Sequence, residues 1–102
     1  MEVKLNTTVS EKLKKPPVSM SGVVFGTVFT NHMFNMVWEE EKGWHNAEIK
    51  PYGPLILAPS SIVLHYAQMS FEGLKAYQSD SGKHLLFRPR ENFKRMNRTS
   101  QR

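Results

Sequence analysis

The chain has 102 residues, a formal net charge of +5 and no cysteine, so its length suits one domain and it contains neither a disulfide framework nor thiolate chemistry. Hydrophobic residues make up 39% of it and aromatic residues 11%, which predicts a folded core. No run approaches the ~20 apolar residues of a membrane span, and the first residues lack the apolar stretch of a secretory signal, so we expect a cytoplasmic protein.

The start of the chain falls into two segments of different composition. Residues 1–22 are predicted to form an arm, because Pro16 and Pro17 exclude a regular helix there and turn-forming Ser and Gly residues follow. Residues 23–30 combine β-branched and aromatic side chains with Gly26. That pattern predicts a buried strand or an extended segment, with a bend at the glycine. We expect the domain itself to cover residues 23–102.

A β-hairpin is predicted next. Phe34, Met36 and Trp38 alternate with other residues along 31–40, and a strand would place these three side chains on one face. Three glutamates and a lysine lead into Gly43, which is typical of a solvated turn that uses the permissive dihedral angles of glycine. Residues 44–49 are predicted to return as the second strand.

The rest of the chain is predicted to form short elements and one longer helix. In chain order we expect a strand at 55–57, a brief helix capped by Ser60 or Ser61 and running through His65, and strands at 71–77 and 84–87. The longer helix is predicted from Pro89 at its first position and Glu91 in its first turn, with Phe93 and Met96 on a buried face. These elements define an α+β protein with antiparallel strands and one or two helices.

Basic residues are concentrated at the end of the chain. Within the predicted helix Arg95, Arg98 and Arg102 lie at i, i+3 and i+7, so they form one stripe beside the apolar face. An arginine there can present a planar fork to phosphate oxygens and keeps its charge at any working pH. The same stripe also suits a solvated basic face or a nucleic-acid contact. Spacing alone leaves these alternatives open.

Aromatic residues surround a glycine in the preceding segment. Tyr66, Phe71 and Tyr77 could wall an apolar ligand that approaches the backbone at Gly73, but ordinary β-sheet packing gives the same pattern. Lys75 is either a site residue or a surface lysine whose stem covers apolar neighbours. The four histidines have no metal-ligand spacing, so we predict no metal site.

Seven short motifs follow one another along the chain. They are Phe25–Met33, Gly43–Trp44, Ile49–Pro51, Leu64–Tyr66, Phe71–Tyr77, Leu86–Pro89 and Asn92–Arg98. In this order they resemble the N-terminal domain of branched-chain amino acid aminotransferases, the fold-type IV enzymes that use pyridoxal phosphate. The resemblance covers most of the chain from about Lys14 onward, and so many ordered motifs are far more specific than any one of them.

The resemblance implies a role for five residues. Arg95 would bind the cofactor phosphate. Phe25, Tyr66 and Phe71 would line the apolar substrate pocket, with Tyr66 reaching into the site of a neighbouring subunit. Lys75 matches a lysine near the site that is distinct from the Schiff-base lysine. The implied activity is the transfer of the amino group of leucine, isoleucine or valine to 2-oxoglutarate, by a homodimer or larger assembly in branched-chain amino acid biosynthesis.

The chain departs from the family in two ways. Asn31 stands where the family usually has an aspartate before His-Met, which affects local hydrogen bonding more than the fold. Family members are also much longer, and the Schiff-base lysine belongs to a second domain that nothing in this chain matches. Because that lysine both holds the cofactor and moves the proton, we expect no catalytic residue here and no transaminase activity from the isolated chain.

Other functions remain as alternatives. One is a non-catalytic truncated product or a dimerising interaction domain. A D-amino acid aminotransferase or an aminodeoxychorismate lyase would share the fold, but the Phe71–Tyr77 run and the long arm favour the branched-chain type. A nucleic-acid binder is the weakest alternative, because a helix that binds a cofactor phosphate already explains the basic residues.

Overall fold

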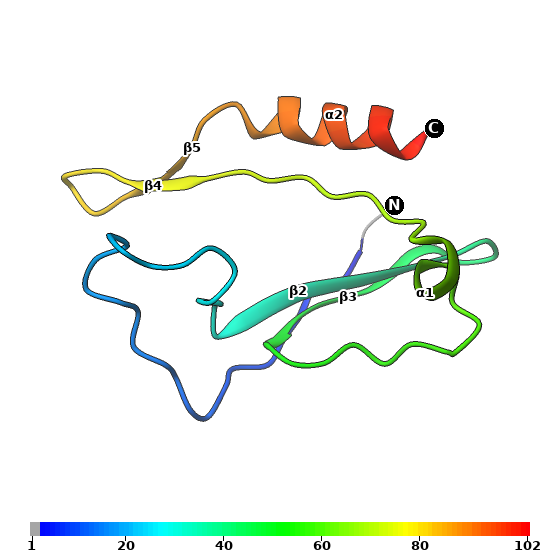
Figure 1. The fold of residues 1–102 in the computed structure, drawn as a ribbon, viewed down its shortest axis with the longest axis horizontal. Helices are drawn as coiled ribbons and strands as arrows, with labels where there is room; N and C mark the ends of the chain where they lie inside the picture. Colours follow the sequence, from blue (N-terminus) through cyan, green and yellow to red (C-terminus); the bar gives the residue numbers. More distant parts are fainter. Residues whose placement is uncertain (1–2) are drawn as a thin grey trace. The chain divides into compact units, whose positions relative to one another are not determined.

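In the computed structural model, which describes residues 3–102, the chain divides into one unit that ends at Ile56 and a second unit, Leu57–Arg102. The first unit contains β1 (Asn6–Thr7), β2 (His32–Glu39) and β3 (Gly43–Pro51), and the second contains α1 (Ile62–Tyr66), β4 (Ala76–Gln78), β5 (His84–Leu86) and α2 (Pro89–Ser100) (Figure 1). The predicted α+β class is confirmed. The division into an arm and a domain at residue 22 stays a prediction.

The β2–β3 hairpin is confirmed. The two strands are antiparallel and place Trp38 opposite Trp44. The turn between them is closed by a hydrogen bond from the Lys42 N–H to the Glu39 carbonyl oxygen, 3.2 Å long. Gly43 follows at a φ of 66°, a left-handed conformation that glycine adopts without the steric cost of a side chain.

The hairpin contains a bulge that the alternation of side chains did not predict. Asn35 on β2 faces Glu48 on β3, and Val37 faces His45, so two steps along β2 correspond to three steps along β3. Within this stretch of β3, Asn46 has a φ of 53°. Such an extra residue bends the strand and changes which face the following side chains occupy. The extra residue lies on β3, so the alternation along β2 is uninterrupted, but Phe34 and Trp38 are exposed and Met36 is half-buried.

Residues from the predicted arm are attached to the sheet of the first unit. β1 pairs in parallel with β3, giving the strand order β1-β3-β2. Further along, the Ser10 N–H donates to His32 Nε2 at 2.9 Å. The Asn31 side chain then exchanges two hydrogen bonds with the backbone of Lys14. The arm therefore contacts the outer edge of β3 first and the start of β2 afterwards.

Two predicted strands are absent from the described residues. Residues 23–30, predicted as a buried strand or an extended segment, form no strand and are mostly exposed, with a turn at Phe25 and Gly26, where Gly26 has a φ of 76°. The bend predicted at Gly26 is confirmed. Residues 55–57 lie between Pro54 and Pro59 without pairing to another strand.

The second unit contains the predicted helices and a smaller hairpin. α1 begins after Ser61, whose side chain makes no capping hydrogen bond. β4 and β5 pair antiparallel, but the predicted strand at 71–77 is paired only from Ala76 onward. Within residues 3–102, neither helix has the length and apolar character needed to cross a membrane.

α2 begins with Pro89 and carries Glu91 in its first turn, as predicted. It ends at Ser100, so Arg102 lies outside the helix and the predicted three-arginine stripe is wrong at its last position. The predicted apolar face is not buried either. Phe93 is exposed and Met96 is half-buried.

Candidate functional site

Arg95 on α2 is held by Glu72 from the extended segment before β4. The Arg95 Nε donates to Glu72 Oε2 at 2.7 Å, and the Arg95 Nη2 donates to Glu72 Oε1. The backbone N–H of Gly73 and the Nδ2 of Asn92 also donate to Oε1, at 3.1 and 3.2 Å. Both oxygens of the carboxylate are therefore occupied by donors.

These contacts favour the charged forms of both partners. The hydrogen bond from Arg95 is the main reason why the pKa of Glu72 falls from its ordinary 4.5 to about 2, against an opposing effect of burial and with smaller contributions from Asn92 and Gly73. The same contact raises the pKa of Arg95. The exposed fractions differ sharply: the Glu72 side chain is 7% exposed and that of Arg95 is 60% exposed. The acid is enclosed, whereas the cation remains accessible.

The chain before β4 and α2 run side by side in opposite directions. Ser70 Oγ lies 3.0 Å from Ser100 Oγ, and Asn92 Nδ2 donates to the Gly73 carbonyl oxygen at 2.8 Å. The lengths agree, because three extended residues cover about 10 Å and eight helical residues cover about 12 Å. Figure 1 shows this segment passing along α2. The segment is therefore joined to α2 by side-chain contacts at Ser70, Glu72 and Gly73 and not by strand pairing.

The other residues predicted for the site lie on exposed positions. Tyr66 is the last residue of α1 and is 83% exposed, and Phe71 is 86% exposed. Phe71 directly precedes Glu72, but its side chain is exposed whereas that of Glu72 is enclosed. Lys75 places its Nζ 5.3 Å from the centroid of the Tyr77 ring, a cation–π distance.

Phe25 belongs to the first unit, where it is fully exposed on the turn around Gly26. Of the five predicted residues, Arg95 has one ionic partner, Glu72, and Phe71 is the residue directly before Glu72. Their roles toward a cofactor or a substrate stay predictions.

Glu72 and Asn92 were not among the residues predicted from sequence for the site. A signal for Glu72 was available, because it is a carboxylate within the mostly apolar run Phe71–Tyr77 and an enclosed acid needs a charged or hydrogen-bonding partner. The basic helix downstream was the obvious source of that partner. Asn92 is the first residue of the Asn92–Arg98 motif, but its contacts depend on the register between the segment and the helix, which no local pattern indicates.

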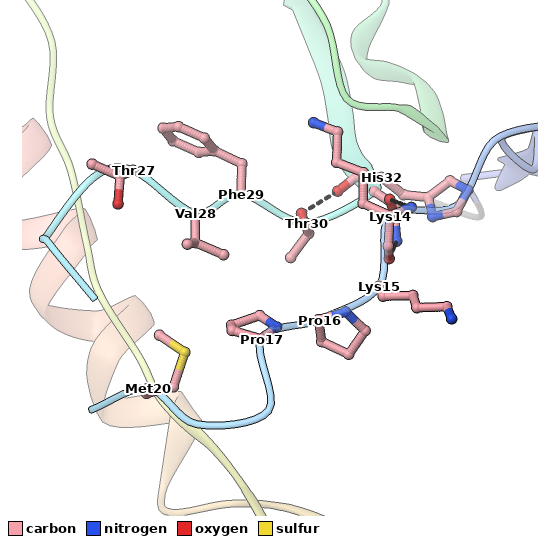
Figure 2. Close-up of a pocket in the computed structure, with 11 residues that line it drawn as sticks. Lys14, Lys15, Pro16, Pro17, Met20, Thr27, Val28, Phe29, Thr30 and His32 are labelled. Atoms are coloured by element: carbon pink, nitrogen blue, oxygen red, sulfur yellow. Dashed lines mark hydrogen bonds between the residues drawn. The ribbon is translucent and has the colours of Figure 1, made fainter. Parts of the chain in front are cut away.

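The first unit has a hollow of its own, with a volume of about 910 Å³. Figure 2 shows it between the run from Lys14 to Met20 and the run from Thr27 to His32. Beside it, Phe29 stacks on Tyr52 with the ring centroids 5.1 Å apart and the planes 16° apart. Phe25 is not among the lining residues.

No family model matches the chain, but several curated proteins do. It is 54% identical over 95 residues to the branched-chain-amino-acid transaminase 1 of Bacillus subtilis, covering 93% of this chain and 26% of that protein. It is 48% identical over 101 residues to the cytosolic branched-chain-amino-acid aminotransferase of Saccharomyces cerevisiae, covering 99% and 26%. A probable branched-chain-amino-acid aminotransferase of Streptomyces coelicolor is 49% identical over 78 residues, covering 76% and 22%.

Sequence identity of 44–54% over 93–99% of the chain is high enough to establish its family. The chain belongs to the branched-chain-amino-acid aminotransferase family, as the resemblance of its motifs predicted. It spans about a quarter of the length of the curated relatives it matches.

Proposed function

We propose that this chain forms part of a pyridoxal-phosphate-dependent branched-chain aminotransferase, as its small N-terminal domain. The complete enzyme would transfer the amino group of leucine, isoleucine or valine to 2-oxoglutarate. The observation that carries the proposal is the fixed but accessible guanidinium of Arg95 on α2. The relatives' names support the reaction, and the yeast relative's name supports a cytosolic location.

The chemistry of Arg95 fits a phosphate group. A phosphate needs several N–H donors and positive charge, and a guanidinium has five N–H donors in a rigid plane. Glu72 engages the edge formed by Nε and Nη2, which leaves the edge formed by Nη1 and the second Nη2 hydrogen for another anion. When bound, the cofactor supplies an electron-withdrawing ring that stabilises negative charge at the amino acid α-carbon.

The proposed substrate residues are aromatic, which suits branched aliphatic substrates. Phe25, Tyr66 and Phe71 would cover the substrate side chain and exclude water from it, and each buried methylene contributes about 0.8 kcal/mol. Lys75 would add a positive charge near the substrate. The exposure of these side chains supports the proposal that they await further protein or ligand.

The proposal includes no catalytic residue within these 102 residues and no metal. The isolated chain, given leucine, 2-oxoglutarate and added pyridoxal phosphate, is expected to produce no glutamate above the protein-free rate. Clear turnover by the purified chain would contradict the proposal that the lysine performing the chemistry lies in another domain.

A chimera tests the role of the chain within a complete enzyme. This chain would replace the matching segment of the Bacillus subtilis transaminase 1, to which it is 54% identical. We expect L-leucine transaminase activity with no activity on D-alanine. Arg95→Ala in the chimera is expected to lower kcat/KM about a hundredfold, because a misplaced reacting group costs that much, whereas Arg98→Ala serves as the matched control. An inactive but folded chimera would contradict the proposal.

The complete enzyme is proposed to be a homodimer. A second candidate function, a non-catalytic dimerising domain, is favoured by the many exposed apolar side chains, such as Ile56 and Phe87, because surfaces of this kind mark interaction sites. The two candidate functions are distinguished by measuring the mass of the isolated chain in solution by light scattering and the activity of the chimera. A chain that dimerises but gives no active chimera supports the second candidate.

A further inference from the structure

The Glu72 carboxylate is fixed more firmly than an ordinary surface ion pair. Its partners are one backbone N–H, the Nδ2 of Asn92 and two nitrogens of Arg95. Asn92 also donates to the Gly73 carbonyl oxygen at 2.8 Å, so the same amide joins both the acid and its backbone to α2. A carboxylate with this many donors has little freedom to rotate.

This arrangement determines how Arg95 is presented. A free arginine side chain samples many rotamers and loses that freedom on binding an anion. Here the Nε–Nη2 edge is already engaged, although the side chain is 60% exposed. We propose that Glu72 is the positioning residue for Arg95, holding its guanidinium so that the remaining edge binds the phosphate of the cofactor. The inference rests on the proposed function, in which Arg95 binds that phosphate.

Two effects of Glu72 on anion binding oppose each other. Its negative charge reduces the attraction of Arg95 for phosphate, whereas its hydrogen bonds remove the entropic cost of ordering the guanidinium. The charge effect is weakened because the Gly73 N–H and Asn92 also donate to the carboxylate, and because solvent reaches Arg95 and screens the interaction. We therefore expect positioning to dominate, and the sign of a mutational effect separates the two.

The test is an NMR titration of the ¹⁵N-labelled 102-residue chain, observed at the Arg95 side-chain Nε–Hε signal and the α2 amides. The probes are pyridoxamine 5′-phosphate, which has no aldehyde to react with lysines, inorganic phosphate, and pyridoxamine without phosphate. The two phosphates are expected to shift the Arg95 signal, and pyridoxamine is not. Arg95→Lys is expected to abolish the α2 response, and Arg98→Ala is expected to preserve it.

Glu72→Gln is expected to weaken phosphate binding about tenfold, which corresponds to the loss of one charged hydrogen bond, and to speed exchange of the Arg95 Nε–Hε proton. Asn92→Ser keeps the charges of Glu72 and Arg95 but removes the amide that links the carboxylate to α2. It therefore tests the positioning of Arg95 without a change in charge, and it replaces Glu72→Gln as the test if that variant fails to fold. It is expected to weaken binding in the same direction.

The outcomes distinguish the two proposals. If the wild-type chain gives no phosphate response, Arg95 does not bind phosphate in this chain and the inference fails, whereas the proposed function fails separately if the folded chimera is inactive. If wild type responds through Arg95 but Glu72→Gln or Asn92→Ser binds equally well or more tightly, Arg95 remains a phosphate ligand and the positioning role of Glu72 is wrong.

Discussion

Asn31 pairs with the backbone of Lys14 through both ends of its side-chain amide. The Lys14 N–H donates to Asn31 Oδ1 at 2.7 Å, and Asn31 Nδ2 donates to the Lys14 carbonyl oxygen at 3.0 Å. The amide therefore satisfies one donor and one acceptor of the arm, as a neighbouring strand would. An aspartate, which the resemblance leads one to expect at this position, can accept the first bond but cannot donate the second.

Asn31→Asp is expected to loosen the arm. It removes the donor to the Lys14 carbonyl and places a carboxylate oxygen beside it, at a cost of about 1 kcal/mol. Trypsin should then cut the Lys14–Lys15 bond about fivefold faster, since about 1.4 kcal/mol corresponds to a factor of ten. Asn97→Asp, the same chemical change on α2, is the control. Equal cleavage rates in Asn31→Asp and wild type would show that the pairing does not hold the arm.

The Glu72–Arg95 contact predicts a pH dependence at acid pH. Because folding lowers the pKa of Glu72 from 4.5 to about 2, the contact adds stability above the ordinary pKa. That contribution falls progressively as the pH drops from about 4.5 to about 2 and is absent below both values. Carboxyl-detected NMR of Glu72 is expected to give a midpoint near 2, and Arg95→Ala should move it up toward 4.5. A Glu72 midpoint unaffected by Arg95→Ala would show that the arginine is not the cause.

The stacked pair Phe29 and Tyr52 is expected to contribute beyond the area that each ring buries. Parallel rings at this separation are typically worth about 0.5–1.5 kcal/mol in double-mutant cycles. A cycle of Phe29→Leu and Tyr52→Leu, measured by urea unfolding, is expected to give a coupling free energy in that range. Tyr52→Phe keeps the ring and should preserve the coupling. Additive effects of the two leucine substitutions would mean that the rings do not interact.

The sequence predicted well those turns and helix ends that depend only on residues close to one another along the chain. Gly43 lies at the β2–β3 turn with a positive φ, and α2 starts at Pro89 with Glu91 in its first turn, as the local pattern predicted. Both signals act within a few residues, so the sequence contains them in full. For residues 23–30, the buried-strand alternative failed for the converse reason. Its β-branched composition suits a strand, but a strand also requires a partner, which composition cannot specify.

The candidate site shows the same limit over longer distances. The helix stripe indicated Arg95 as a possible phosphate ligand, and the family resemblance made that role specific. Glu72 lies 23 residues away in sequence, and its contact depends on the register of an extended segment against a helix. No periodic pattern encodes such a register. The bulge at Asn46 was also missed, although asparagine adopts a left-handed φ, here 53°, more readily than most other non-glycine residues.

Gly43→Ala is expected to destabilise the hairpin of the first unit. At a φ of 66° an added Cβ approaches the following carbonyl oxygen, which costs roughly 1–2 kcal/mol. The free energy of unfolding should fall by that amount, and the cross-strand NOE between Trp38 and Trp44 should weaken. Gly53→Ala is the matched control, because its Cβ meets nothing within 4 Å and Gly53 has no positive φ. Equal stability of the two variants would mean that the left-handed conformation at Gly43 does not determine this turn.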